Sequence, residues 1–221
     1  MNASEKTLAF VRLVRDRFPD RAIKSVLVVG CGDGEEAELL AAFFDCAVTA
    51  IDTDDRFRPR GPAVTFQRMD ARAMSLPSDS FDLVYSFHAL EHIVPAEDAI
   101  REMRRVLKPA MPFCIGTPNR HRLAGYVGSP DASLLTKLRW NWMDWRARLS
   151  GRFTNALGAH AGFTEGELSA LGAMIGPAES VSDDYYRRIH ARRARLIGWI
   201  IAARLQRIAW PAAYIVGQKA G

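Results

Sequence analysis

Several common protein classes are excluded by what the sequence lacks. Its three cysteines are too few, and odd in number, for the disulfide framework of a small secreted protein. No segment approaches the ~20 continuous apolar residues that cross a bilayer. The first residues mix charged with apolar side chains, unlike the apolar core of a signal peptide. The sequence has no regular period of the kind that indicates a repeat protein. We therefore expect a single domain in a reducing, cytoplasmic location.

The sequence also lacks a metal-site pattern and an evenly spread positive charge. No group of His, Cys, Asp and Glu has metal-ligand spacing, so no metal is expected. The net charge of +5 is unevenly distributed along the chain. Residues 1–118 carry 15 basic and 18 acidic groups, and residues 164–186 carry no basic and five acidic groups. Residues 119–163 carry seven and two, and residues 187–221 carry eight and none. Because the excess of basic over acidic groups is confined to two segments, a surface that wraps nucleic acid is not expected.

Strand-forming and helix-forming segments alternate along the chain. Short apolar runs typical of buried strands, as at 24–29, alternate with amphipathic segments, as at 35–44. This order predicts an α/β fold with a doubly wound, mostly parallel sheet. The expected strands are 24–29, 47–51, 64–68, 81–86, 112–117, 178–182 and 212–216. The expected helices are 4–18, 35–44, 95–107, 164–174 and a long basic helix from about 186, and the link 52–64 is expected to contain no more than a turn.

A glycine-rich turn follows the first expected strand in the stretch VLVVGCGDGEEAELL. Gly30, Gly32 and Gly34 let the backbone turn tightly and let a ligand approach it. The dinucleotide fingerprint places its third glycine three residues after the second, where this sequence has Glu35. Glu35 and Glu36 would also repel a pyrophosphate at the start of the next helix. The pattern therefore favours a cationic or zwitterionic ligand over a dinucleotide.

Two aspartates follow the next strands. Asp52 ends the second strand, where a carboxylate can accept hydrogen bonds from both hydroxyls of a ribose. Asp70 follows the third strand and is placed to accept a bond from an adenine amino group. An adenosine without phosphates that carries a positive charge elsewhere describes S-adenosylmethionine.

With the segments AIDTDD, MDARAMSLPSDSFDLVYSFHALEHI and REMRRVLKP, this stretch resembles the class I S-adenosylmethionine-dependent methyltransferases. The similarity covers residues 24–118 and is specific to the type 11 group, which resembles enzymes of ubiquinone and menaquinone biosynthesis. It implies a seven-stranded Rossmann-like sheet and S-adenosylmethionine as the cofactor. The cofactor-binding residues that it implies are Gly30, Cys31, Gly32, Asp52, Thr53, Asp70, Ala71, Ser86 and Phe87.

The resemblance divides one methyltransferase domain, residues 1–221, into three parts. Residues 1–118 form the cofactor-binding half, and residues 119–163 form an aromatic and basic cap insertion. Residues 164–221 complete the sheet and carry a basic helix at 187–210.

Three histidines are candidate catalytic residues. His88 follows the fourth strand at the edge where ligands bind, and it could act as a general base or orient the acceptor. Its alternative role is that of a spacer or a residue that packs on the cofactor. His121 and His160 lie at the two ends of the cap and could reach the acceptor from there. Glu91 and His92 are expected to position the helix that follows them.

The cap and the basic tail each allow several interpretations. The tryptophans between 140 and 145 could pack a helix on the sheet domain or line a pocket or interface for an apolar acceptor. No recognition motif supports single-stranded nucleic acid as their ligand. Residues 187–210 have seven arginines and no acidic residue, so they could lie on an anionic membrane surface, such as the inner membrane face. A packed helix with snorkelling arginines, or a subunit contact, is the alternative.

Methyl transfer from S-adenosylmethionine is the function that these features predict. The acceptor is expected to be a small molecule or a lipid- or sugar-linked group, anionic or amphipathic, with O-methylation favoured. One alternative is a protein that binds S-adenosylmethionine without catalysis and acts as a partner or regulator. A nicotinamide-dependent oxidoreductase is disfavoured by the glycine spacing. The sequence leaves the acceptor and the oligomeric state open.

Overall fold

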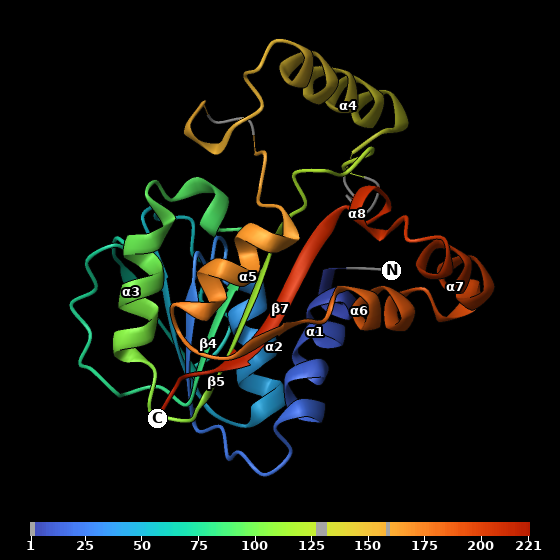
Figure 1. The fold of residues 1–221 in the computed structure, drawn as a ribbon. Helices are drawn as coiled ribbons and strands as arrows, with labels where there is room; N and C mark the ends of the chain where they lie inside the picture. Colours follow the sequence, from blue (N-terminus) through green and yellow to red (C-terminus); the bar gives the residue numbers. More distant parts are fainter. Residues whose placement is uncertain (1–2, 127–131, 158–159) are drawn as a thin grey trace.

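A seven-stranded sheet forms the centre of the protein (Figure 1). The computed structural model describes residues 3–126, 132–157 and 160–221. The strand order is β3-β2-β1-β4-β5-β7-β6, with β7 antiparallel to both of its neighbours and the remaining pairs parallel. The strands are β1 Ser25–Val29, β2 Ala47–Asp52, β3 Val64–Arg68, β4 Leu83–Phe87, β5 Pro112–Pro118, β6 Ala178–Ser180 and β7 Ala212–Gln218. This arrangement confirms the predicted α/β fold.

Helices cover both faces of this sheet, as the continuous apolar character of the strands requires. In β1, Val26 and Val28 face one apolar core, and Leu27 and Val29 face the other. The first core is closed by α1, α2 and α6, and the second by α3 and α5. The helices are α1 Ala3–Arg17, α2 Glu35–Phe44, α3 Ala96–Val106, α4 Leu134–Leu149, α5 Glu165–Ala173, α6 Ser182–Ile189, α7 Ala194–Ala202 and α8 Gln206–Ala209.

The link between β2 and β3 contains no helix, as expected from its composition. The ring of Phe57 stacks on that of Phe66, with centroids 4.9 Å apart. Arg60 forms an ion pair with Asp33 at 2.9 Å. The link therefore packs against the glycine-rich turn that follows β1.

The prediction of one long helix over 187–210 is wrong. The segment is divided into the end of α6, a short 3-10 turn at Ala191–Arg193, α7 and α8, with Arg204 in the left-handed region at φ 56°. A straight helix would separate residues 186 and 210 by roughly 36 Å. Instead, the rings of Tyr186 and Trp210 stack with centroids 4.3 Å apart. This contact requires the chain to fold back, and it overrides the local preference for helix.

The longest helix of the cap, α4, stands beyond the sheet (Figure 1). Ser133 caps its first turn by accepting a hydrogen bond from the backbone of Thr136. The aromatic face of α4 is not packed on the sheet domain, since none of the helix's side chains is buried. Among the described residues, no helix is long and apolar enough to span a membrane.

Asp82 holds the start of β1 and the end of α3 together at the edge of the sheet opposite the glycine-rich turn. Its carboxylate accepts hydrogen bonds from the backbone of Lys24 at 2.9 Å and Ser25 at 3.0 Å, and from the Lys108 ammonium at 2.7 Å. Burial alone would raise the pKa of Asp82. These donors outweigh burial, and the pKa lies below its ordinary value.

We predict that Asp82→Asn lowers the free energy of unfolding near pH 7 by about 2 kcal/mol, because buried donors lose a charged acceptor. Since folding lowers the pKa of Asp82, its contribution is complete above the unfolded-state pKa of about 3.9 and is lost below the folded-state value. Urea unfolding should show the difference from wild type shrinking as the pH falls. An unchanged difference in acid would contradict this account. Asp79→Asn, at an exposed pair with Lys219, is the control with little effect.

Candidate functional site

The candidate site lies at the carboxyl ends of β1 and β4. From β1 the chain proceeds outward through β2 to β3, and it then returns to place β4 on the other side of β1. The connections at the ends of β1 and β4 therefore leave in opposite directions. Such a switch point opens the crevice in which doubly wound sheets bind their ligands.

The glycine-rich turn lies at this switch point, directly after β1. Gly30, Gly32 and Gly34 all have positive φ, at 76°, 54° and 88°. A Cβ on Gly30 would lie 2.2 Å from the Cβ of Ala89, and one on Gly34 would lie 2.4 Å from the ring of Phe57. Around a Cβ on Gly32, no atom of the described residues other than its chain neighbours lies within 4 Å. The missing Cβ at Gly30 and Gly34 therefore allows internal packing, and the missing Cβ at Gly32 leaves open space beside the backbone for a ligand.

Asp52 is fixed beside Gly32. One carboxyl oxygen accepts the backbone N–H of Gly32 at 2.8 Å, and the other accepts the backbone N–H of Asp54 at 3.0 Å. Because each carboxylate oxygen has two lone pairs, both retain a free acceptor position. The side chain can thus receive two neighbouring hydroxyls, as on a ribose. The next residue, Thr53, uses its backbone carbonyl to accept a bond from Arg68 at 2.9 Å.

Asp70 has a partner that the sequence reading missed. The guanidinium of Arg72 donates to both of its carboxyl oxygens, at 2.7 to 3.1 Å. These hydrogen bonds hold the pKa of Asp70 below its ordinary value. Both side chains are exposed, and Ala71 between them is buried. An adenine amino group would approach a carboxylate that is already held by an arginine.

Cys31, Ser86 and Phe87 complete the implied cofactor set. Burial, followed by the negative charge of Asp52, raises the pKa of the Cys31 thiol to about 12, so this thiol stays protonated. Ser86 is completely buried, and its hydroxyl has no hydrogen-bond partner among the described residues. The ring of Phe87 lies edge-on to that of His88, with centroids 4.3 Å apart. A buried hydroxyl without a partner is uncommon in a folded protein.

His88 is held by the chain at the end of β4. Its φ is 51°, and its backbone N–H donates to the carbonyl of Gly116 at 2.8 Å. Nδ1 of the ring lies 3.4 Å from a carboxyl oxygen of Glu91, whose side chain is only 2% exposed. The second oxygen of Glu91 has no partner among the described residues. A buried carboxylate therefore faces one nitrogen of a half-exposed histidine.

His160 joins this group from the cap, and His121 does not. The ring of His160 lies edge-on to that of His92, with centroids 4.5 Å apart, and His92 lies 4.0 Å from Glu91. Burial, with a smaller contribution from His92, lowers the pKa of His160. His121 instead accepts a hydrogen bond from the Arg207 guanidinium at 3.0 Å. Burial and the charge of Arg207 lower the pKa of His121.

The first helix, α1, packs against the start of α2, which the sequence did not indicate. Ser4 donates to Glu35 at 3.0 Å, and Thr7 donates to Glu36 at 3.0 Å. Burial raises the pKa of Glu36 to about 7, although Thr7 and His88 act in the opposite direction. The start of α2 is thus occupied by carboxylates bonded to α1. In the described ranges, no three His, Cys, Asp or Glu residues form a group that could hold a metal ion.

Known proteins share the part of the chain that carries this site. Residues 27–115 match the family described as "Methyltransferase domain". A probable S-adenosylmethionine-dependent methyltransferase of Mycolicibacterium smegmatis is 35% identical over 103 residues, or 44% of this chain and 39% of that protein. The 27-O-demethylrifamycin SV methyltransferase of Amycolatopsis mediterranei is 30% identical over 122 residues, or 51% and 45%. The chain thus spans less than half the length of these relatives.

A solved structure extends the comparison to the whole fold. The YcgJ protein of Bacillus subtilis superposes with a TM-score of 0.57 at 18% sequence identity, covering 96% of this chain and 98% of that one. This likeness shows a shared fold that extends beyond the matching family segment.

We predict that alanine at two neighbouring glycines separates folding from ligand binding. Gly30→Ala should lower the free energy of unfolding by at least ~2 kcal/mol, because its Cβ collides with Ala89. Gly32→Ala should cost only about 1 kcal/mol for its positive φ. It should nevertheless weaken S-adenosylhomocysteine binding, because the new methyl group occupies ligand space. Thermal unfolding and calorimetry measure the two effects. Full affinity in Gly32→Ala would contradict the placement of the ligand.

Proposed function

We propose that the protein, whose residues 27–115 match the family described as "Methyltransferase domain", transfers a methyl group from S-adenosylmethionine to a small-molecule or lipid-linked acceptor. The observation that carries the proposal is the pairing of Asp52 with the backbone of Gly32 at the switch point. It offers free acceptor positions for ribose hydroxyls next to open backbone. The residues present therefore fit an adenosine ligand.

Each residue around the crevice has a proposed part in binding. Asp52 holds the ribose, Gly30, Cys31 and Gly32 line the cofactor with their backbone, and Ser86 offers its free hydroxyl to a polar group. S-adenosylmethionine supplies a methyl group that is already activated by its sulfonium. The protein then has to orient the acceptor and exclude competing groups.

We assign His88 as the general base for a hydroxyl acceptor. With Nδ1–H directed to the Glu91 carboxylate, Nε2 is left free to take the proton of the hydroxyl. Glu91 is a positioning residue, because it fixes the orientation and tautomer of His88 without reaching the acceptor. His160 forms part of the wall on the cap side. His121, engaged by Arg207, is the weaker candidate.

The charge of the cap and the name of one relative support the proposed acceptor class. The rifamycin relative is named for an O-demethylated substrate, which supports O-methylation. The excess of basic over acidic groups in 119–163 and 187–221 favours an anionic or amphipathic acceptor. The same excess of basic groups favours a cytoplasmic protein that contacts the inner face of a membrane. Residues 187–210, which form separate short helices, would make this peripheral contact. A protein that binds the cofactor without catalysis is the alternative, which measured turnover would exclude.

We predict that calorimetry detects S-adenosylmethionine and S-adenosylhomocysteine binding but no NADH binding. Asp52→Asn should weaken both ligands by roughly tenfold or more, because charge-assisted hydrogen bonds to the ribose are lost. Asp54→Asn is the matched control, since Asp54 pairs with exposed Arg56 and should leave affinity unchanged. Tight NADH binding, or equal affinity in wild type and Asp52→Asn, would overturn the cofactor assignment.

We predict that His88→Ala lowers acceptor-dependent release of S-adenosylhomocysteine by about a hundredfold while cofactor affinity is kept. Glu91→Gln should lower kcat by about tenfold with little change in KM, because the base is present but poorly oriented. His121→Ala tests the competing histidine. Full turnover in His88→Ala, or an equal loss in His121→Ala, would refute the assignment of the base.

A further inference from the structure

The helix α4 presents its apolar side chains to solvent. It is 16 residues long, and within the part of the chain that the structure describes none of its side chains is buried. A globular protein normally turns the apolar stripe of a surface helix toward its core. Here the most exposed large side chains include Leu135 at 79%, Trp142 at 70% and Leu149 at 86%. An apolar surface of this kind marks a site of interaction.

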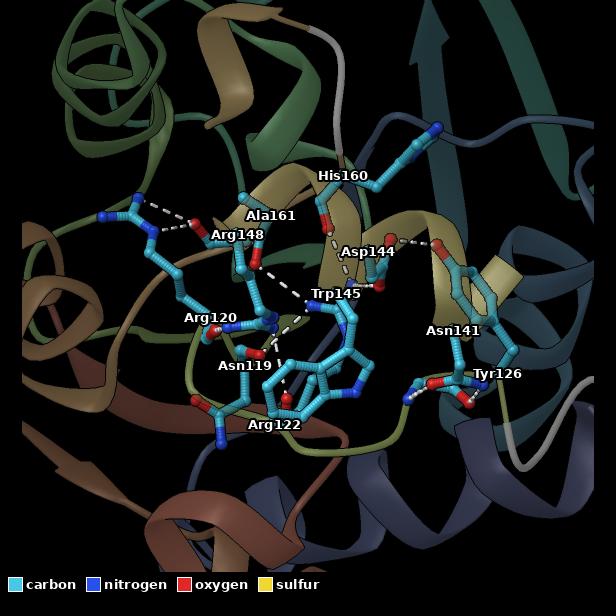
Figure 2. Close-up of polar contacts among 12 residues, drawn as sticks. Asn119, Arg120, Arg122, Tyr126, Asn141, Asp144, Trp145, Arg148, His160 and Ala161 are labelled. Carbon is cyan, nitrogen blue, oxygen red and sulfur yellow. Dashed lines mark hydrogen bonds and ion pairs between the residues drawn. The ribbon is translucent and has the colours of Figure 1, made fainter. Parts of the chain in front are cut away.

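The polar face of α4 is the one that attaches it to the protein (Figure 2). The Asn141 side chain accepts the backbone N–H of Gly125 at 2.7 Å and donates to its carbonyl at 3.0 Å. Asp144 accepts a bond from Arg122 at 2.9 Å. Arg148 donates to the carbonyls of Arg120 and Arg122, at 2.7 and 3.1 Å. Asn141, Asp144 and Arg148 are three, four and seven positions apart and therefore share one helix face. This face is used for attachment to the rest of the protein.

The apolar stripe lies on the adjoining side of the helix. At 100° per residue, six apolar side chains fall within an arc of about 100° that excludes Asn141, Asp144 and Arg148. They are Leu134, Leu135, Leu138, Trp142, Trp145 and Leu149, and all are exposed. Trp145, at the border with the polar face, also donates its Nε1–H to the carbonyl of Leu123 at 3.1 Å. We call this set the α4 stripe. Its amphipathicity is inverted relative to that of a helix that packs on a core.

Charge around the α4 stripe indicates what covers it. Arg139 and Arg146 lie beside the stripe, on the side away from the polar face that attaches α4, and both are exposed. The single acidic residue of α4, Asp144, is neutralised by Arg122 on the opposite border. A second copy of the protein would bring like charges together, and this is unfavourable. Leucines and tryptophans bordered by arginines match an anionic bilayer surface, where the apolar stripe enters the headgroup boundary.

The stripe is connected to the candidate active site by one buried residue. Arg122 is 4% exposed and donates to Asp144 of α4 and to the carbonyls of His160 and Ala161. His160 in turn contacts His92 beside Glu91. A helix lying on a membrane would therefore hold the cap side of the crevice close to the lipid surface.

We infer that the α4 stripe docks on an anionic lipid surface and brings the crevice to an acceptor that is carried in that surface. The docking is a property of α4, whereas the delivery of a lipid-linked acceptor rests on the proposed methyl transfer. The contact surface is α4 in the cap, in addition to any contact made by 187–210.

Vesicle flotation of the full chain tests the inference. Wild type should float with phosphatidylcholine vesicles that contain about one third phosphatidylglycerol and much less with phosphatidylcholine alone. The double variant Leu138→Glu/Trp142→Glu should reduce recovery about tenfold or more, because two charges enter the inserted face. Met143→Glu, an exposed apolar position outside the stripe, is the matched control and should float like wild type. Arg139→Glu/Arg146→Glu should remove the dependence on anionic lipid.

Calorimetry with S-adenosylhomocysteine on the same variants separates the two proposals. Unchanged affinity with lost flotation supports docking and leaves the proposed function intact. Flotation without cofactor binding would retain docking and refute the proposed function. Equal flotation of wild type and the stripe variant would overturn the inference. Light scattering that shows a dimer, broken by the stripe variant, with no flotation of wild type would also overturn it in favour of a second copy.

Discussion

The parallel order of the central strands is the constraint on which the rest of the structure depends. Parallel strands bring all their carboxyl ends to one edge of the sheet, and a change of direction beside the first strand opens that edge. The glycine-rich turn, Asp52 and His88 are far apart in the sequence, yet each directly follows or ends a strand that meets at this edge. The pairing of Gly32 with Asp52 then fixes the turn against the neighbouring strand.

A second, smaller constraint determines the cap. Arg122 is buried and makes hydrogen bonds to three segments, the turn at Asn119, the helix α4 and the chain at His160 and Ala161. A buried guanidinium is tolerated only when most of its donors are matched, and these carbonyls with Asp144 match the four N–H groups of its two terminal nitrogens. Because this polar attachment uses one face of α4, the apolar side chains of the helix face outward. The cap is therefore joined to the crevice by hydrogen bonds and exposes an apolar surface.

Local sequence patterns were sufficient to predict the sheet and the resemblance to S-adenosylmethionine-dependent methyltransferases. Runs such as Val26 to Val29 are apolar on both faces, and this predicts a central parallel strand without knowledge of its partners. Contacts between particular side chains could not be predicted from such local patterns. The stacking of Tyr186 on Trp210 divides a segment that has helical composition, and Arg72 occupies Asp70. In α4 the apolar periodicity was apparent, but periodicity alone does not say which face meets the protein.

The most direct test of the central claim is a crystal structure with S-adenosylhomocysteine bound. We expect the ribose hydroxyls to lie on the free acceptor positions of the Asp52 carboxylate, the ligand to lie over the open backbone of Gly32, and the sulfur to lie on the side of His88 and Ser86. An adenosine bound elsewhere, with Asp52 and Gly32 facing solvent, would contradict it.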